Sequence, residues 1–159
     1  MRTKMRGYTL IEGDLLNADA DFICHQVNCQ GKMASGVAKF VRERYPQVYE
    51  QYMKFYNINT VEQLLGFSQY VKVSDTEGQK PYYVVNMFAQ ANYGYDGKQY
   101  TSLEAFKKCL ESINSHCIGY TVAFPWMIGC VRGGADWNVV LPMILETLTN
   151  VKEIRFYRL

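Results

Sequence analysis

Short apolar runs alternate with amphipathic stretches along the whole chain. The apolar runs, which we expect to form strands, cover residues 8–12, 21–27, 68–73, 81–87, 121–124 and 153–157. Between them, helical patterns cover residues 37–44, 48–56, 60–64, 103–113 and 137–149. Helices that cover the faces of a largely buried sheet produce this alternation, so the pattern predicts an α/β fold.

Local signals mark where two of these helices begin or end. Pro46 ends the helix of residues 37–44, because the residue before a proline is pushed out of the helical region. The sequence Thr101-Ser102-Leu103-Glu104 has the form of a capping box and predicts the start of the next long helix.

The segments between these helices predict a hairpin and a long loop. Residues 68–73 and 81–87 are expected to pair across the charged turn 74–80. The loop 88–100 is polar and aromatic, and we expect it to act as a lid. No linker or repeat interrupts the pattern, so residues 1–159 are expected to form a single domain.

Composition narrows the class of protein. A hydrophobic share of 48% with 20% charged residues is typical of a soluble globular domain. The net charge of +2 provides no broad field for a polyanion, so we do not expect a nucleic-acid partner. No apolar stretch has the length of a membrane span and the N-terminus lacks a secretory signal, which predicts a cytoplasmic protein without a membrane partner.

The cysteines point the same way. Their number is odd, no C-x-x-C pair occurs, and reduced thiols of a cytoplasmic protein are expected at Cys24, Cys29, Cys109, Cys117 and Cys130. Only two histidines accompany them, and no spacing matches a zinc site. We therefore expect neither a metal nor another cofactor.

Two glycine-containing loops carry the candidate chemistry. Residues 28–36 and 128–134 each follow a predicted strand and open a predicted helix. Glycine there allows a close approach of the backbone, so that amide groups and the helix N-terminus converge on phosphate oxygens. Neither loop has a standard nucleotide-binding fingerprint, and glycine in such turns can serve geometry alone. Two loops in the same position favour a phosphate-binding site.

Four motifs in order along the chain resemble those of one family. Gly13-Asp14-Leu15-Leu16 is similar to its G-D-[IL] element, and HQVNCQGKMASGVAKFVRERYP resembles H-x-x-N-x-x-G-x-x-G-x-G-[IV]-A, with Ala34 where glycine is common. PWMIGCVRGGADW resembles P-x-I-G-C-G-L-x-x-x-x-W, and the ending RFYRL is similar to V-Y-x-L. The chain thus resembles the macrodomain (Appr-1''-p processing) family, closest to the branch of terminal ADP-ribose glycohydrolases and ADP-ribose-1''-phosphate phosphatases.

The resemblance implies a three-layer α/β/α fold with a mixed, mostly parallel central sheet, and a cleft for ADP-ribose. Asp14 and Leu15 would contact adenine, although Asp14 taken alone is more typical of a turn or N-cap residue. Tyr157 would stack on adenine or belong to the core, and Asn28 would contact the distal ribose. The residues implied around this ribose and the diphosphate are Gly31, Met33, Ala34, Ser35, Gly36 and Val37. The residues implied for the opposite wall are Ile128, Gly129, Cys130, Val131, Arg132 and Gly133.

Two members of that wall have open roles. Arg132 is either a ligand contact or a solvated loop charge. Cys130 is a thiol near a helix N-terminus, and we interpret it as a packing residue because the family assigns that position no chemistry.

Catalysis is where the resemblance weakens. The glycohydrolase branch uses a lysine after the hairpin strand and an aspartate in the second loop, and the alignment places Met87 and Gly133 there, so that reaction is not expected. A phosphatase-like reaction would use His25 as general acid or base and Asn28 to hold water, but His25 is also readable as a buried strand histidine. We expect binding of ADP-ribose or a derivative, with hydrolysis of ADP-ribose-1''-phosphate or ADP-ribosyl groups as a further activity. The alternative is a non-catalytic reader of ADP-ribosylated protein.

Overall fold

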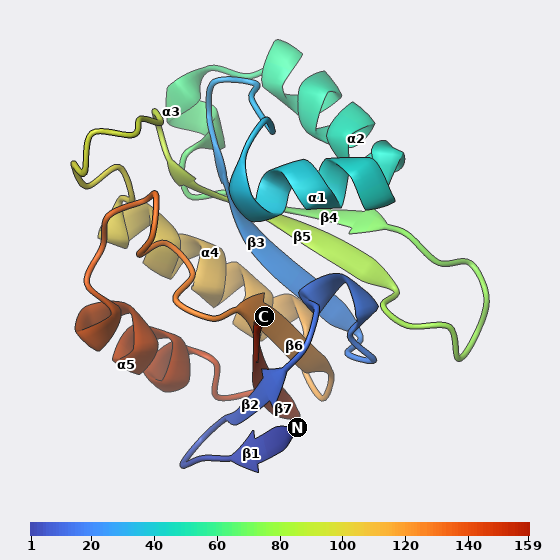
Figure 1. Cartoon of the computed structure of the whole chain (residues 1–159). Coiled ribbons are helices and arrows are strands. Elements are labelled where there is room, and N and C mark those ends of the chain that lie inside the picture. Colours follow the sequence, from blue (N-terminus) through green and yellow to red (C-terminus); the bar gives the residue numbers. More distant parts are fainter.

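One seven-stranded sheet forms the centre of the protein, whose computed structural model describes all residues 1–159 (Figure 1). The strands are β1 (Arg2–Lys4), β2 (Thr9–Glu12), β3 (Phe22–Asn28), β4 (Ser68–Lys72), β5 (Tyr83–Gln90), β6 (Thr121–Pro125) and β7 (Glu153–Arg158). The helices are η1 (Leu15–Asn17), a 3-10 turn, and α1 (Gly36–Arg44), α2 (Pro46–Asn57), α3 (Val61–Leu64), α4 (Leu103–His116) and α5 (Trp137–Thr147).

Helices cover both faces of this sheet and give three layers (Figure 1). On one face, Val41 of α1, Tyr52 of α2 and Leu64 of α3 pack against Val84 and Phe88 of β5. On the other face, α4 packs against β5, and Val85, Met87 and Ala89 of this strand belong to a core that they share with residues of α4 and α5. Successive residues of β5 therefore point to opposite cores, as expected for a strand buried on both faces.

The strand order is β1-β2-β7-β6-β3-β5-β4. The pairs β2–β7, β7–β6, β6–β3 and β3–β5 are parallel, whereas the edge strands β1 and β4 are antiparallel to their neighbours. The predicted three-layer fold with a mixed, mostly parallel sheet is thus confirmed. From β3 the chain first builds β4 and β5 on one side and then returns to β6 on the other, so β3 and β6 flank a topological switch point, where open α/β sheets bind ligands.

β3 and β6 stay together for only a short distance. Their register comprises Phe22 beside Val122 and Ile23 beside Ala123. Beyond these pairs, β3 continues along β5 to Asn28, while β6 continues along β7 to Pro125. The two strands therefore diverge toward their carboxyl ends and leave a wedge between them.

Several element boundaries differ from those predicted. β1 has no counterpart in the prediction because its three residues are all exposed and carry no apolar alternation. β5 extends to Gln90 instead of Met87, since Phe88 and Ala89 are completely buried, so the loop begins after residue 90. The capping box was predicted wrongly: Ser102 is the N-cap of α4, and its hydroxyl accepts a hydrogen bond from Ala105 N at 3.2 Å.

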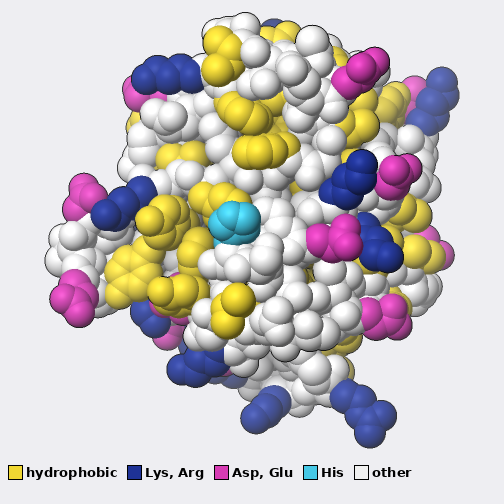
Figure 2. All heavy atoms as spheres, turned by 180° about the vertical axis from the view of Figure 1, so that it is seen from behind, with side chains coloured by type: hydrophobic (Ala, Val, Ile, Leu, Met, Phe, Trp, Pro, Cys, Tyr) yellow, Lys and Arg dark blue, Asp and Glu magenta, His cyan; other side chains and the backbone are white.

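Figure 2 shows the face of the molecule opposite to the one seen in Figure 1. Basic and acidic side chains are interspersed across this face, without a continuous basic field. An exposed histidine, His116, stacks on Tyr70 with 5.0 Å between ring centroids. No helix combines the length and the apolar character needed to cross a membrane.

Candidate functional site

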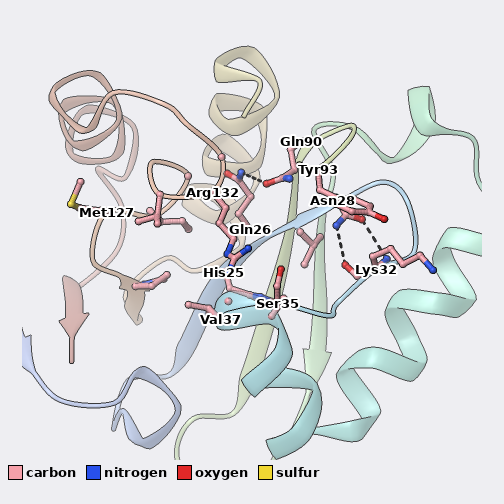
Figure 3. A pocket seen from close by; sticks show the side chains of 18 of the residues that line it. His25, Gln26, Asn28, Lys32, Ser35, Val37, Gln90, Tyr93, Met127 and Arg132 are labelled. Atoms are coloured by element: carbon pink, nitrogen blue, oxygen red, sulfur yellow. Dashed lines mark hydrogen bonds between the residues drawn. The ribbon is translucent and has the colours of Figure 1, made fainter. Parts of the chain in front are cut away.

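The wedge between β3 and β6 opens into a cleft of about 550 Å³ (Figure 3). Both glycine loops contribute to its walls, together with the ends of β3, β5 and β6 and with Tyr93, Gly94 and Tyr95. The predicted facing arrangement of the two loops is thus present, because segments a hundred residues apart in sequence share one cavity.

Hydrogen bonds within the first loop hold its shape. The side chain of Asn28 donates to the Lys32 carbonyl at 2.9 Å (Figure 3). It also accepts from the Gln30 amide at 3.0 Å. From α2, the buried hydroxyl of Tyr52 donates to the Asn28 carbonyl at 2.8 Å. Gly31 has a φ of +73°, and a Cβ there would lie 2.9 Å from the Tyr56 ring. The loop therefore requires glycine at that position and is tied to α2.

A polar network at the cleft floor holds the second loop. Gln26 of β3 donates from Nε2 to Thr101 Oγ1 at 2.7 Å, and the Thr101 hydroxyl donates to the Gly129 carbonyl at 2.8 Å. The same Gln26 amide lies 2.7 Å from Gln90 Oε1 (Figure 3). Gly129 has a φ of +78°, so the chain turns sharply at the residue whose carbonyl accepts the hydrogen bond from Thr101.

Tyr95 bridges the two loops at the mouth of the cleft. Its hydroxyl donates to Ser35 Oγ of the first loop at 3.2 Å, and the Arg132 guanidinium of the second loop lies 4.6 Å from the centre of its ring. Its side chain is nevertheless 68% exposed. The segment after β5, which was expected to form a lid, thus reaches across the opening; its movement stays a prediction.

The charges at the cleft favour an anion. Its only lysine or arginine side chains are Lys32 and Arg132, and no aspartate or glutamate lines it. At the first loop, Ser35 is the N-cap of α1 but makes no side-chain capping bond, so the amides of the first turn remain available. Such a helix start adjoining a basic cleft is suited to phosphate oxygens.

His25 lies under this region, on β3. Its side chain is only 1% exposed, and Nε2 lies 2.6 Å from Asn86 Oδ1. Burial lowers the pKa of His25 to about 4. The ring is therefore neutral near pH 7, which disfavours the predicted general-acid role and favours the buried-histidine interpretation.

Comparisons with known proteins bear on the fold. No family model matches the chain. DNA ADP-ribosyl glycohydrolases of Mycobacterium tuberculosis and Mycobacterium bovis are 25% identical to it over 142 residues, which is 89% of this chain but 39% of theirs.

Two solved structures are similar over almost the whole chain. The macrodomain of Mycobacterium tuberculosis DarG has a TM-score of 0.72 at 24% identity, covering 96% of this chain and 99% of that one. The chain has the macrodomain fold. Thermosipho africanus DarTG in complex with ADP-ribose has a TM-score of 0.79 at 20% identity, covering 99% of this chain and 43% of that one.

In this structure, the predicted residues divide into two groups. Those that line the cleft are His25, Asn28, Ala34, Ser35, Gly36, Val37, Ile128, Gly129, Val131, Arg132 and Gly133. Those outside its lining are Asp14, Leu15, Gly31, Met33, Cys130 and Tyr157. Contact with a ligand stays a prediction for both groups.

For Asp14, Tyr157 and Cys130 of the second group, the surroundings support the roles other than ligand binding. The Asp14 carboxylate accepts a hydrogen bond from Leu16 N at 3.0 Å and so caps η1. Met33 and Tyr157 are 1% and 8% exposed and belong to the core. Burial raises the pKa of the Cys130 thiol to about 11, which keeps it protonated and agrees with a packing role.

The alignment at the glycohydrolase lysine needs a correction. Met87 is completely buried in the core beneath α4 and does not line the cleft. The β5 residue that lines the cleft is Gln90, three residues further along, because the strand is longer than predicted. At Gly133, a Cβ atom would collide with Thr101, so this loop conformation leaves no room for an aspartate there.

Sequence reasoning missed several lining residues. Gln26, Lys32, Gln90 and Tyr93 are polar positions without a motif, and Met127 precedes the second loop. The one sequence signal for Gln26 is its position two residues before Asn28, near the carboxyl end of the same strand.

The Tyr52 hydroxyl gives a first prediction. Tyr52→Phe removes the donor to the Asn28 carbonyl, and we expect a loss of about 1–2 kcal/mol in the free energy of unfolding, together with weaker ligand binding. Urea denaturation measures the first effect and calorimetric titration the second. Tyr56→Phe, on the same helix but outside this network, should change stability by less than about 0.5 kcal/mol. Equal effects of the two substitutions would contradict the anchoring role.

The pKa of His25 gives a second prediction. Because the pKa is about 4 in the folded protein against an ordinary 6.5, the unfolded chain takes up a proton first as the pH falls. The contribution of neutral His25 to the free energy of unfolding is complete above the ordinary pKa of 6.5. It declines, by roughly 3 kcal/mol in total, as the pH falls toward the pKa of about 4 in the folded protein. Urea denaturation from neutral pH to roughly pH 4 measures it. His25→Gln should lack this part of the pH dependence, and an unchanged profile would refute the assignment.

Proposed function

We propose that the cleft binds ADP-ribose or a derivative, with the diphosphate between the two glycine loops. The observation that carries the proposal is that both loops line one cavity of about 550 Å³, a volume typical of a small-molecule site. Arg132 and the open first turn of α1 supply positive charge from opposite walls, and no carboxylate opposes them.

The ends of the cleft suggest how the ligand is oriented. Met127 and Lys32 lie at opposite ends in Figure 3. Trp126 precedes Met127 in the chain and also lines the cleft, and the aromatic and apolar character of this pair suits the adenine base. The Lys32 end holds Asn28 and Gln90, which suit the hydroxyls of the terminal ribose. A phosphate on that ribose, as in ADP-ribose-1''-phosphate, would meet the Lys32 ammonium.

Binding is the activity that the geometry supports best. Similar proteins are known as DNA ADP-ribosyl glycohydrolases, and Thermosipho africanus DarTG was solved with ADP-ribose, but this chain covers 39% and 43% of those proteins. In this cleft no aspartate or glutamate is available for acid–base work, and His25 is buried and neutral. We therefore place binding, including retention of an ADP-ribosylated protein, ahead of hydrolysis.

A cytoplasmic location accompanies the proposal. All five cysteines are free thiols, and four of them are buried. Reduced cysteines in a domain without disulfides suit a reducing compartment.

The ligand preference gives a third prediction. Calorimetric titration should show tighter binding of ADP-ribose than of AMP, which lacks the second phosphate and the terminal ribose. Val131 lines the cleft and is 77% exposed, so it can be changed without disturbing the core. Val131→Asp should weaken ADP-ribose binding roughly 10-fold at low salt by repelling the diphosphate.

Val131→Asn is the matched control, because asparagine has nearly the same shape as aspartate but carries no charge. It should bind ADP-ribose with close to the original affinity. Equal affinity for ADP-ribose and AMP, or identical effects of the aspartate and asparagine variants, would refute the proposed diphosphate site.

A further inference from the structure

His25 has one ring nitrogen that nothing in the protein uses. Nδ1 is buried and has no hydrogen-bond partner. The residue is only 1% exposed, yet it contributes to the lining of the cleft, between the ends marked by Met127 and Lys32 (Figure 3). A buried polar atom without a partner is costly, so its place at the cleft points to a ligand.

A chain of side-chain amides fixes which nitrogen carries the proton. Gln69 donates from Nε2 to the Gln51 backbone carbonyl at 2.9 Å, and this carbonyl can only accept. The other end of that amide, Oε1, therefore accepts from Asn86 Nδ2 at 3.0 Å. Asn86 then presents Oδ1 to His25 Nε2 at 2.6 Å. Since both ends of each amide are assigned, Nε2 must be the donor.

The unused nitrogen is consequently an acceptor. With one proton on the neutral ring and that proton on Nε2, Nδ1 offers only a lone pair. Its counterpart in a ligand must be a hydrogen-bond donor. An ionised phosphate has no donor to offer, whereas each ribose of ADP-ribose carries hydroxyl groups.

We propose that His25 Nδ1 accepts a hydrogen bond from a ribose hydroxyl of the bound nucleotide and so selects ligands that carry this hydroxyl. The inference rests on the proposed function and names a contact within that site. Asn86 and Gln69 act as positioning residues, because they hold the ring in the tautomer that accepts. His25 lies between the two ends of the cleft, so the donor is a hydroxyl of either the adenosine ribose or the terminal ribose. The experiment distinguishes these two riboses.

The test pairs one substitution with ligands that differ in hydroxyls. His25→Gln places an amide nitrogen near Asn86, in the role of Nε2, and removes the acceptor at the Nδ1 position. Calorimetric titration compares the wild type and this variant with ADP-ribose, ADP, 2'-deoxy-ADP and 3'-deoxy-ADP. His116→Gln, at the exposed end of α4, is the control and should leave all four affinities unchanged.

The pattern of losses identifies the hydroxyl. A loss of roughly 10-fold for ADP-ribose but none for ADP assigns the terminal ribose. A similar loss for ADP-ribose and ADP, absent for one deoxy nucleotide, assigns the adenosine ribose. An equal loss for all four ligands, or no loss for any, overturns the proposal. Failure of the proposed function is recognised separately, because the wild type would then not prefer ADP-ribose to AMP.

A measurement on the wild-type protein covers the case in which His25→Gln does not fold. Nitrogen-15 spectra of the imidazole should show a proton on Nε2 and a bare Nδ1 in the free protein. Addition of ADP-ribose should shift the Nδ1 resonance in the direction of a hydrogen-bonded acceptor. A proton on Nδ1 in the free protein, or a resonance unmoved at saturation, would contradict the proposal.

Discussion

β3 and β6 share two residue pairs and then separate, and this divergence makes the room in which the whole site is built. If the two strands had stayed paired to their ends, the loops that follow them would have met backbone to backbone. Because each strand instead continues with its outer neighbour, the loops face one another across a cavity. The parallel direction of both strands places the starts of α1 and α5 at the same edge of the sheet.

The floor of this cavity is polar although it lies deep in the protein. Two side-chain networks cross it: Gln26 leads through Thr101 to the second loop, and His25 leads through Asn86 and Gln69 to α2. Apolar residues at these positions would avoid the cost of burying polar groups. The networks instead fix the second loop and the His25 tautomer, so the polar floor is understood as part of the binding site and its geometry.

Sequence patterns predicted the layers, the helices and the two loops, since these depend on periodicity and on glycine. They failed where three-dimensional pairing decides. The end of β5 was misplaced by three residues. Gln90 was therefore missed, and the glycohydrolase lysine was aligned with Met87, which lies inside the core. The role of Gln26 could not be seen either, because its partner Thr101 is 75 residues away along the chain. Tyr95 was placed in a lid but its contacts with Ser35 and Arg132 were not foreseeable.

In the proposed complex, two separate loops hold one diphosphate. A crystal structure with ADP-ribose tests it most directly. We expect phosphate oxygens within hydrogen-bonding distance of backbone amides from both segments, residues 34–37 on one side and 129–133 on the other. A diphosphate bound to only one of these segments, or a nucleotide outside the wedge between β3 and β6, would contradict it.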